Sequence, residues 1–188
     1  MSKFSFTTAP FVRSVLNYLA NFGLPQWLME AAGTLILLTL FTMATWLTAP
    51  FESTSSGNLV MGTIRTGIDK FIDNPRFKFR VEVSWPYTAA QKGMPSESDS
   101  ELMEEVTEAL ESAFKADPVA VLAGIYTGDG ERTLLFYTLS LHIFQRKFNE
   151  ALAQFPTLPL QFEAFEDPEW EEYRQMLAFA KADDSDPE

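Results

Sequence analysis

The sequence contains no cysteine and a single histidine, His142. The absence of cysteine excludes disulfides, thiolate metal sites and cysteine nucleophiles. A serine–histidine–carboxylate triad would have to use His142, yet the chain has no Gly-x-Ser-x-Gly turn to present a serine. The His-Glu-x-x-His zinc motif, the P-loop and the Gly-x-Gly-x-x-Gly dinucleotide motif are also absent. We therefore expect a non-catalytic protein with no catalytic residue, no metal and no cofactor.

Positive charge is scarce and unevenly placed. The chain has 14 basic and 26 acidic residues, which gives a net charge of -12. Four of each lie at or before Asn74, so the remaining 10 basic and 22 acidic residues lie between Pro75 and Glu188. Nucleic-acid phosphates and anionic lipid headgroups repel such a domain. Its expected partners are basic protein surfaces or cations; the alternative is that acidity only keeps the domain soluble.

One long segment, Ala31–Ala49, contains no charged residue. As a helix it would span about 28 Å, close to the roughly 30 Å hydrocarbon thickness of a bilayer. Pro25 precedes it and Pro50 follows it, which favours a bounded helix. We expect a single transmembrane helix, with a buried core helix or a cleaved signal peptide as alternatives. The expected membrane-anchor residues are Ala31, Leu35, Leu38, Phe41, Trp46 and Ala49.

The flanks of this segment carry further patterns. Phe11–Leu24 has apolar residues at helical spacing, which is typical of an amphipathic helix on a membrane surface or against a neighbouring helix. Basic residues accumulate on the C-terminal side, which favours a cytoplasmic C-terminal domain. Glu52–Asn58 has a linker composition, and Leu59–Ile72 has the spacing of a short helix. The expected organisation is an amphipathic segment (1–30), a transmembrane helix (31–49), a linker with a short helix (50–74), an acidic domain (75–181) and an acidic tail (182–188).

The acidic domain begins with a clear strand pattern. Apolar and polar residues alternate from Phe77 to Trp85, which predicts a strand with one solvated face. Ser98 and Glu101 have the spacing of a capping box, and a helix follows as far as Asp117. The glutamates of this helix lie opposite its apolar stripe, so we expect a solvated face and not a buried acid–base pair.

A second half of the domain follows the first. Val119–Thr127 and Arg132–Thr138 predict a hairpin around Gly128-Asp129-Gly130, a turn that lacks the Asp-x-Asp spacing of a calcium loop. Ser140 begins a helix, and Leu158–Phe165 predicts an edge strand because of Pro159. Asp167-Pro168 opens a last helix. The predicted fold class is α+β, a ferredoxin-like βαββαβ domain with an extra C-terminal helix, preceded by a single transmembrane helix.

Five short motifs occur in order along this domain. They are RVEVSWPY (80–87), GMPSE (93–97), GIYTGDGER (124–132), FYT (136–138) and DPEWEEY (167–173). Together they resemble the bacterial domain-of-unknown-function family 695 over about residues 75–176. The N-terminal apolar segment is not part of this resemblance. The resemblance implies a fold without known catalysis and an occasional association with domains similar to a small acidic inhibitor of an endoribonuclease; it assigns no catalytic residue.

Two functional hypotheses follow from these patterns. In the first, the chain is an accessory subunit of a larger integral-membrane complex, whose partners are membrane protein subunits and lipid. In the second, it is a membrane-tethered acidic module that binds and inhibits a basic enzyme such as a nuclease. The residues expected to contact a partner are Phe11, Val15, Leu19, Trp27, Glu104 and Glu108.

Overall fold

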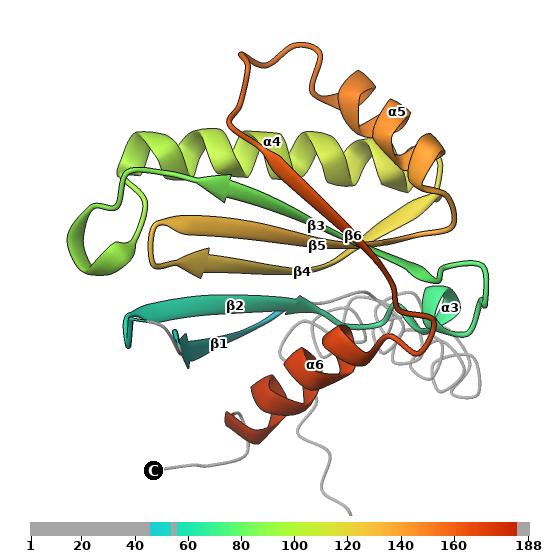
Figure 1. Cartoon of the computed structure of the whole chain (residues 1–188), viewed down its shortest axis with the longest axis horizontal. Helices are drawn as coiled ribbons and strands as arrows, with labels where there is room; N and C mark the ends of the chain where they lie inside the picture. The colour runs from blue at the N-terminus through green and yellow to red at the C-terminus, as the bar shows by residue number, and fades with distance from the viewer. Residues whose placement is uncertain (1–45, 54–55, 184–188) are drawn as a thin grey trace, which may run out of the picture. The chain divides into compact units, whose positions relative to one another are not determined.

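The computed structural model describes residues 46–53 and 56–183 of the chain. They form a six-stranded sheet in the order β1-β2-β4-β5-β3-β6, and every neighbouring pair of strands is antiparallel (Figure 1). The strands are β1 (Trp46–Glu52), β2 (Leu59–Arg65), β3 (Phe79–Pro86), β4 (Ala120–Gly128), β5 (Glu131–Thr138) and β6 (Gln161–Glu166). The helices are α3 (Asp69–Ile72), the 3-10 turn η1 (Gln91–Gly93), α4 (Glu97–Ala116), α5 (Leu141–Ala151) and α6 (Glu171–Asp183).

Helices α4 and α5 cover one face of the sheet (Figure 1). Alternate residues of β3 are buried against them, as the sequence pattern predicts. The buried residues of α4 recur every three or four positions, which gives the helix one apolar face; they are Met103, Val106, Leu110 and Phe114. Phe114 stacks on Phe144 of α5 with ring centroids 5.5 Å apart. This core is built mainly from aliphatic and aromatic side chains, and beside them Arg132 of β5 donates a hydrogen bond to Thr107 Oγ1 of α4 at 3.2 Å.

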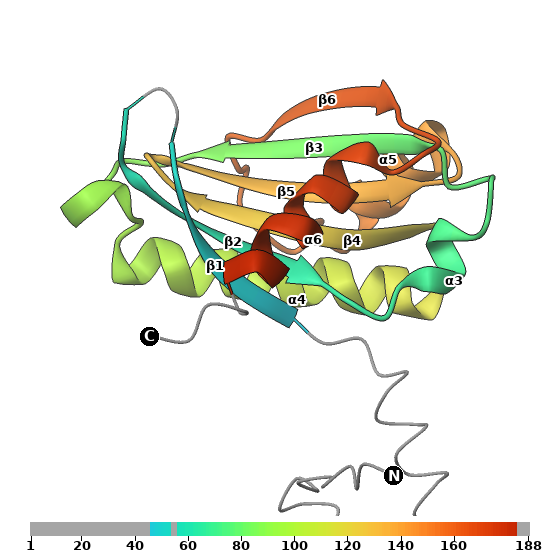
Figure 2. The ribbon, with the colours of Figure 1, turned by 90° about the horizontal axis from the view of Figure 1, so that it is seen from below.

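Helix α6 crosses the opposite face of the sheet diagonally (Figure 2). Trp170, just before α6, stacks on Tyr137 of β5 with ring centroids 3.7 Å apart and an interplanar angle of 6°. The Asp167 carboxylate accepts a hydrogen bond from the Glu171 backbone N–H at 2.8 Å, so it caps the start of the helix. The predicted opening of a last helix at Asp167-Pro168 therefore marks its cap, and the helix itself begins at Glu171.

The predicted fold class is wrong, although the predicted element order is present as β3–α4–β4–β5–α5–β6. The domain is not a simple ferredoxin-like fold, because β1 and β2 extend the sheet beyond β4. Strand β2 pairs with β4 from Val60 opposite Gly128 to Ile64 opposite Gly124. In the part of the chain that the structure describes, no helix is long and apolar enough to cross a membrane.

The prediction of a transmembrane helix over Ala31–Ala49 is wrong at the C-terminal end of that segment, which forms a strand. Trp46 to Ala49 belong to β1, and Ala49 is 1% exposed within the core under α6. An uncharged run does not by itself distinguish a strand from a helix. Pro50, interpreted as a helix terminator, lies inside β1, which is tolerated because β1 is an edge strand in the described sheet. The other expected anchor residues, Ala31, Leu35, Leu38 and Phe41, lie outside the described residues.

The expected short helix over Leu59–Ile72 is also largely wrong. Its first half is β2, and only Asp69–Ile72 is helical. Gly62 faces the Phe51 ring so closely that a Cβ at this position would overlap it. The glycine therefore permits an aromatic ring of β1 to pack over β2. The predicted cap at Ser98 moves to Ser96, whose hydroxyl accepts from the Asp99 N–H at 3.1 Å.

Candidate interaction surfaces

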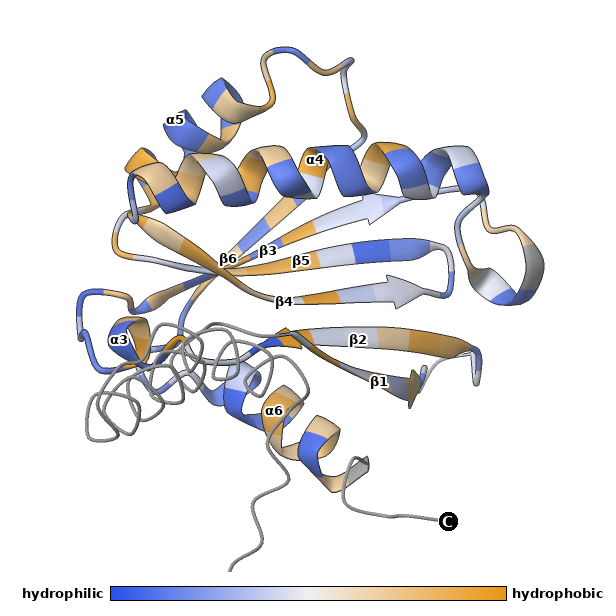
Figure 3. Ribbon diagram, turned by 180° about the vertical axis from the view of Figure 1, so that it is seen from behind, coloured by the Kyte–Doolittle hydropathy of each residue, from blue (hydrophilic) through white to orange (hydrophobic). Residues whose placement is uncertain are grey.

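The outer face of α4 carries a stripe of carboxylates. Glu97, Glu101, Glu104, Glu108 and Glu111 recur every three or four residues, on the side of the helix opposite its buried residues. With a rise of 1.5 Å per residue the stripe is about 20 Å long. The first four are exposed to solvent, as is Glu105 beside them, and Figure 3 shows hydrophilic and apolar turns alternating along the helix. We call this set, with Glu105, the α4 stripe.

The α4 stripe is barely neutralised. Glu111 at one end forms an ion pair with Arg65 of β2 at 3.2 Å. Among the described residues, the other five carboxylates have no basic partner within 4.0 Å. Glutamates four residues apart, such as Glu104 and Glu108, repel each other and destabilise the helix slightly. The stripe therefore presents negative charge that ion pairs within the described residues neutralise only at Glu111.

A second charged cluster lies on the α6 side of the sheet around Arg80. Its guanidinium lies 3.1 Å from the carboxylate of Glu82 and 3.3 Å from that of Glu172 on α6, and Asp167 is 3.9 Å away. The short contact from Arg80 Nε to Glu82 is an ion pair whose angle does not make it a hydrogen bond. Burial raises the pKa of Glu82 above its ordinary value, although Arg80 opposes the shift and Glu172 and Glu163 add to it.

Two tyrosines on the α6 side of the sheet also donate hydrogen bonds. Tyr137 Oη donates to Asp167 Oδ2 at 2.6 Å, and Tyr173 Oη donates to the Arg65 carbonyl at 2.8 Å. Burial raises the pKa of Tyr137, and the Asp167 carboxylate raises it further. Burial also raises the pKa of Tyr173, to about 12. These hydroxyls stay protonated at neutral pH and fix α6 on the sheet, so their role is structural.

The turn between β4 and β5 binds the neighbouring loop. The carboxylate of Asp129 accepts hydrogen bonds from Ser53 Oγ, Ser56 Oγ and Asn58 Nδ2 at 2.7–2.8 Å. These donors, with Asn58 first, lower the pKa of Asp129. Both of its oxygens are thus occupied by the β1–β2 loop. Within residues 46–53 and 56–183, no group of three or more His, Asp or Glu is arranged to hold a metal ion.

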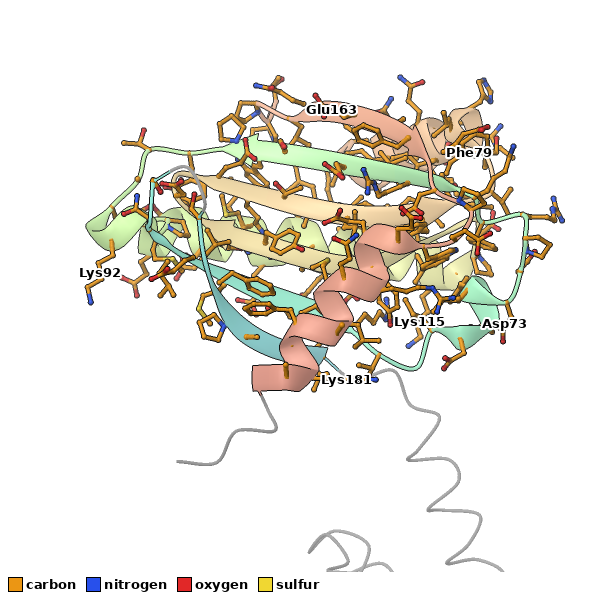
Figure 4. The ribbon with its side chains drawn as sticks, turned by 60° about the horizontal axis from the view of Figure 1, so that its bottom comes forward. Asp73, Phe79, Lys92, Lys115, Glu163 and Lys181 are labelled. Carbon is orange, nitrogen blue, oxygen red and sulfur yellow. The ribbon has the colours of Figure 1, made fainter. Side chains whose placement is uncertain are left out.

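Strand β6 forms an exposed edge of the sheet. All six of its residues are exposed, and its two phenylalanines, Phe162 and Phe165, are 50% and 39% exposed. Figure 4 shows Glu163 on this outer strand, beyond β3. The sequence predicted the strand and its edge position from Pro159. It did not predict the exposed rings, because a strand pattern does not reveal which neighbours cover each face.

The predicted site residues fall in three places. Glu104 and Glu108 lie exposed on the α4 stripe, and no observation tests their role in partner binding. Trp46 is 37% exposed in β1, with the Arg65 guanidinium 5.5 Å from its ring, and His142 is exposed on α5. Phe11, Val15, Leu19 and Trp27 lie outside the described residues.

The Arg80 cluster is a feature that the sequence did not indicate. The alternation of β3 predicts that Arg80 and Glu82 share a solvated face, but nothing local predicts that Glu172, 92 positions after Arg80, lies beside them. Lys78 forms an ion pair with Glu166 at 3.2 Å, and Arg80 forms ion pairs with carboxylates.

The motifs that carry the family resemblance have structural roles in this fold. Trp85 and Phe136 lie in the core under α4, Gly130 has the positive φ that the β4–β5 turn requires, and Trp170 donates to the Phe77 carbonyl at 3.0 Å. No curated protein and no solved structure matches the chain. The family described as a family of unknown function, DUF695, matches residues 51–178, which include β2, α3 and the last two residues of β1 as well as the predicted domain. The chain therefore belongs to the DUF695 family.

Proposed function

We propose that this chain is a non-catalytic protein-binding module in which the α4 stripe binds a basic surface of a partner protein. The observation that carries the proposal is the row of five exposed glutamates that have no basic group within 4.0 Å among the described residues. The described residues carry 12 basic and 22 acidic groups, so the whole domain attracts basic proteins over a distance of about one Debye length. The stripe gives that attraction a defined site.

The charge distribution also favours a protein partner over other classes. Nucleic acid and anionic lipid surfaces are repelled by an acidic domain. The cations that might have served phosphate binding, Lys78 and Arg80, are engaged by carboxylates. A basic enzyme that the module inhibits, such as a nuclease, satisfies these requirements. The role of subunit in an integral-membrane complex stays a prediction that depends on residues outside the described part of the chain.

The test begins with capture of partners from the native extract by the tagged full-length chain. A captured basic protein is then purified, and its Kd is measured at two salt concentrations. The double variant Glu104→Lys/Glu108→Lys should raise the Kd at least about tenfold, because two attractive contacts become repulsive. Its matched control, Glu150→Lys/Glu169→Lys, changes the net charge equally at exposed positions away from α4 and should have a much smaller effect.

Two outcomes count against the proposal. Equal loss of binding in both double variants would mean that only net charge matters and that the stripe is no site. Turnover of a substrate by the isolated chain would contradict the non-catalytic assignment. Co-migration with a multisubunit membrane complex in mild detergent, unaffected by the α4 variant, would favour the membrane-complex hypothesis instead.

A further inference from the structure

The two edges of the sheet are protected to different degrees. In β1, Pro50 removes a backbone donor, and Phe51 stacks on Phe179 of α6 with ring centroids 4.4 Å apart. Strand β6 contains no proline, and its only strand partner among the described residues is β3. Alternate N–H and C=O groups of an edge strand point away from its neighbour, which makes a template for another strand. Figure 2 shows β6 at this outer position.

The side chains of β6 offer contacts on both faces of an added strand. Phe162 lies on the α5 side, where its ring makes an edge contact with Phe148 at 5.1 Å between centroids. Phe165 lies on the other side, with the Arg80 guanidinium 4.5 Å from its ring centroid. The Phe162 side chain remains 50% exposed and the Phe165 side chain 39% exposed. A strand beside β6 would therefore bury aromatic surface on each face of the sheet.

The carboxylates along the β6 edge favour an added strand that carries basic residues. Glu163 lies directly opposite Glu82 in the β3–β6 pairing, and Arg80, the cation next to them, is shared with Glu172. Like charges directly opposite each other are unfavourable, so a basic residue on an added strand would relieve this repulsion. A second copy of the chain would bring more carboxylates to the same edge. A two-fold pairing centred at Glu163 would even set the two Glu163 side chains against each other.

We propose that the free edge of β6 accepts an extended, alternating basic and apolar segment of a partner protein as a seventh strand. The basic residues lie on the side of Glu163, and the apolar residues lie on the side of Phe162. Backbone hydrogen bonds to β6 hold the segment, and the side chains on its two faces select it. This inference shares with the proposed function only the basic character of the partner, since it uses a surface distinct from the α4 stripe.

The experiment uses the full-length chain and a synthetic nine-residue peptide, Lys-Val-Lys-Val-Lys-Val-Lys-Val-Lys. Hydrogen exchange of the amides in residues 161–166 should slow at least about tenfold at saturating peptide, because outward-facing amides gain carbonyl partners. The same peptide with alternate backbone nitrogens methylated keeps its charge but loses its donors on one edge. It should give no such protection.

Charge reversal at the edge provides the second arm. Glu163→Lys should weaken peptide binding about three- to tenfold. Glu104→Lys changes the net charge equally on α4 and should leave peptide binding within about twofold, although it weakens the binding proposed above. The experiment therefore distinguishes failure of the β6-edge proposal from failure of the α4-stripe proposal.

Three results would overturn the inference. The β6 amides of the free chain could already be strongly protected, which would mean that another occupant holds the edge. The methylated peptide could protect β6 as well as the unmodified one, which would reduce the effect to charge attraction. Glu163→Lys and Glu104→Lys could weaken peptide binding equally, which would remove any specific role of the β6 edge.

Discussion

The two faces of the sheet are held in different ways. On the face covered by α4 and α5, the core consists mainly of apolar side chains that recur with strand and helix periods, with few side-chain hydrogen bonds such as that from Arg132 to Thr107. On the face covered by α6, the same kind of apolar contact is joined by bonds from specific polar atoms, above all Tyr137 to Asp167 and Trp170 to the Phe77 carbonyl. The first face depends on a pattern, whereas the second depends on individual residues.

Because of this difference, we expect a single substitution on the α6 face to detach α6 from the sheet. The largest expected effect is at Trp170, which is 1% exposed and both stacks on Tyr137 and donates a hydrogen bond. Trp170→Ala should lower the free energy of unfolding by about 3–5 kcal/mol in urea titrations. Hydrogen exchange of α6 amides should accelerate far more than that of α4 amides.

Phe114→Ala, on the opposite face, is the comparison for Trp170→Ala. Its loss of stability should be similar, since the side chain is 4% exposed in an aromatic cluster. Its exchange signature should instead concentrate in α4 and α5. If Trp170→Ala left α6 as protected as in the wild type, the distinction between the two faces would fail.

An intermediate effect is expected from Tyr137→Phe. The substitution keeps the stacked ring and removes the hydroxyl that donates to the buried Asp167 carboxylate, which should cost about 1–3 kcal/mol in chemical unfolding. Tyr173→Phe removes a bond to a neutral carbonyl and should cost less, about 1 kcal/mol. A larger loss in Tyr173→Phe than in Tyr137→Phe would contradict the anchoring role of Asp167.

The smallest effect is expected at Glu82, where a substitution should raise the stability of the fold instead of lowering it. Because the pKa of Glu82 is raised in the folded state, its contribution to stability is present below about pH 4.5 and is lost as the pH rises through the folded-state pKa. Glu82→Gln should therefore raise the melting temperature by about 1–2 °C at pH 7 and by nothing measurable at pH 4. Glu169→Gln, at an exposed position, should shift it at neither pH.

The sequence predicts the pattern-based part of this fold well. The alternation of β3, the hairpin around Gly128–Gly130 and the cap at Ser140, whose hydroxyl accepts from the Ile143 N–H, all depend on residues close in the chain. The β1–β2 extension was not predictable in the same way, because an uncharged run with several threonines suits a helix or a strand. Its assignment is fixed by the pairing of β2 with β4, sixty or more residues away.

The candidate surfaces also differ in whether residues close in the chain predict them. The α4 stripe follows from helical spacing alone, so the sequence indicated Glu104 and Glu108 correctly as outward-facing residues of that helix. The Arg80 cluster and the exposed rings of β6 depend on how α6 and the last strand meet β3. Local sequence contains no information on such contacts, since they join segments brought together only by the complete sheet.

The most direct measurement is a carboxylate footprint of the module bound to its basic partner. Carbodiimide-activated coupling of glycine ethyl ester, read by mass spectrometry, reports the reactivity of each exposed glutamate. In the complex, the reactivity of Glu101, Glu104 and Glu108 should fall at least about fivefold, because bound interfaces exclude solvent at their centre. Glu150 and Glu169 should react as in the free chain. Unchanged reactivity along α4 in a stable complex would contradict the account.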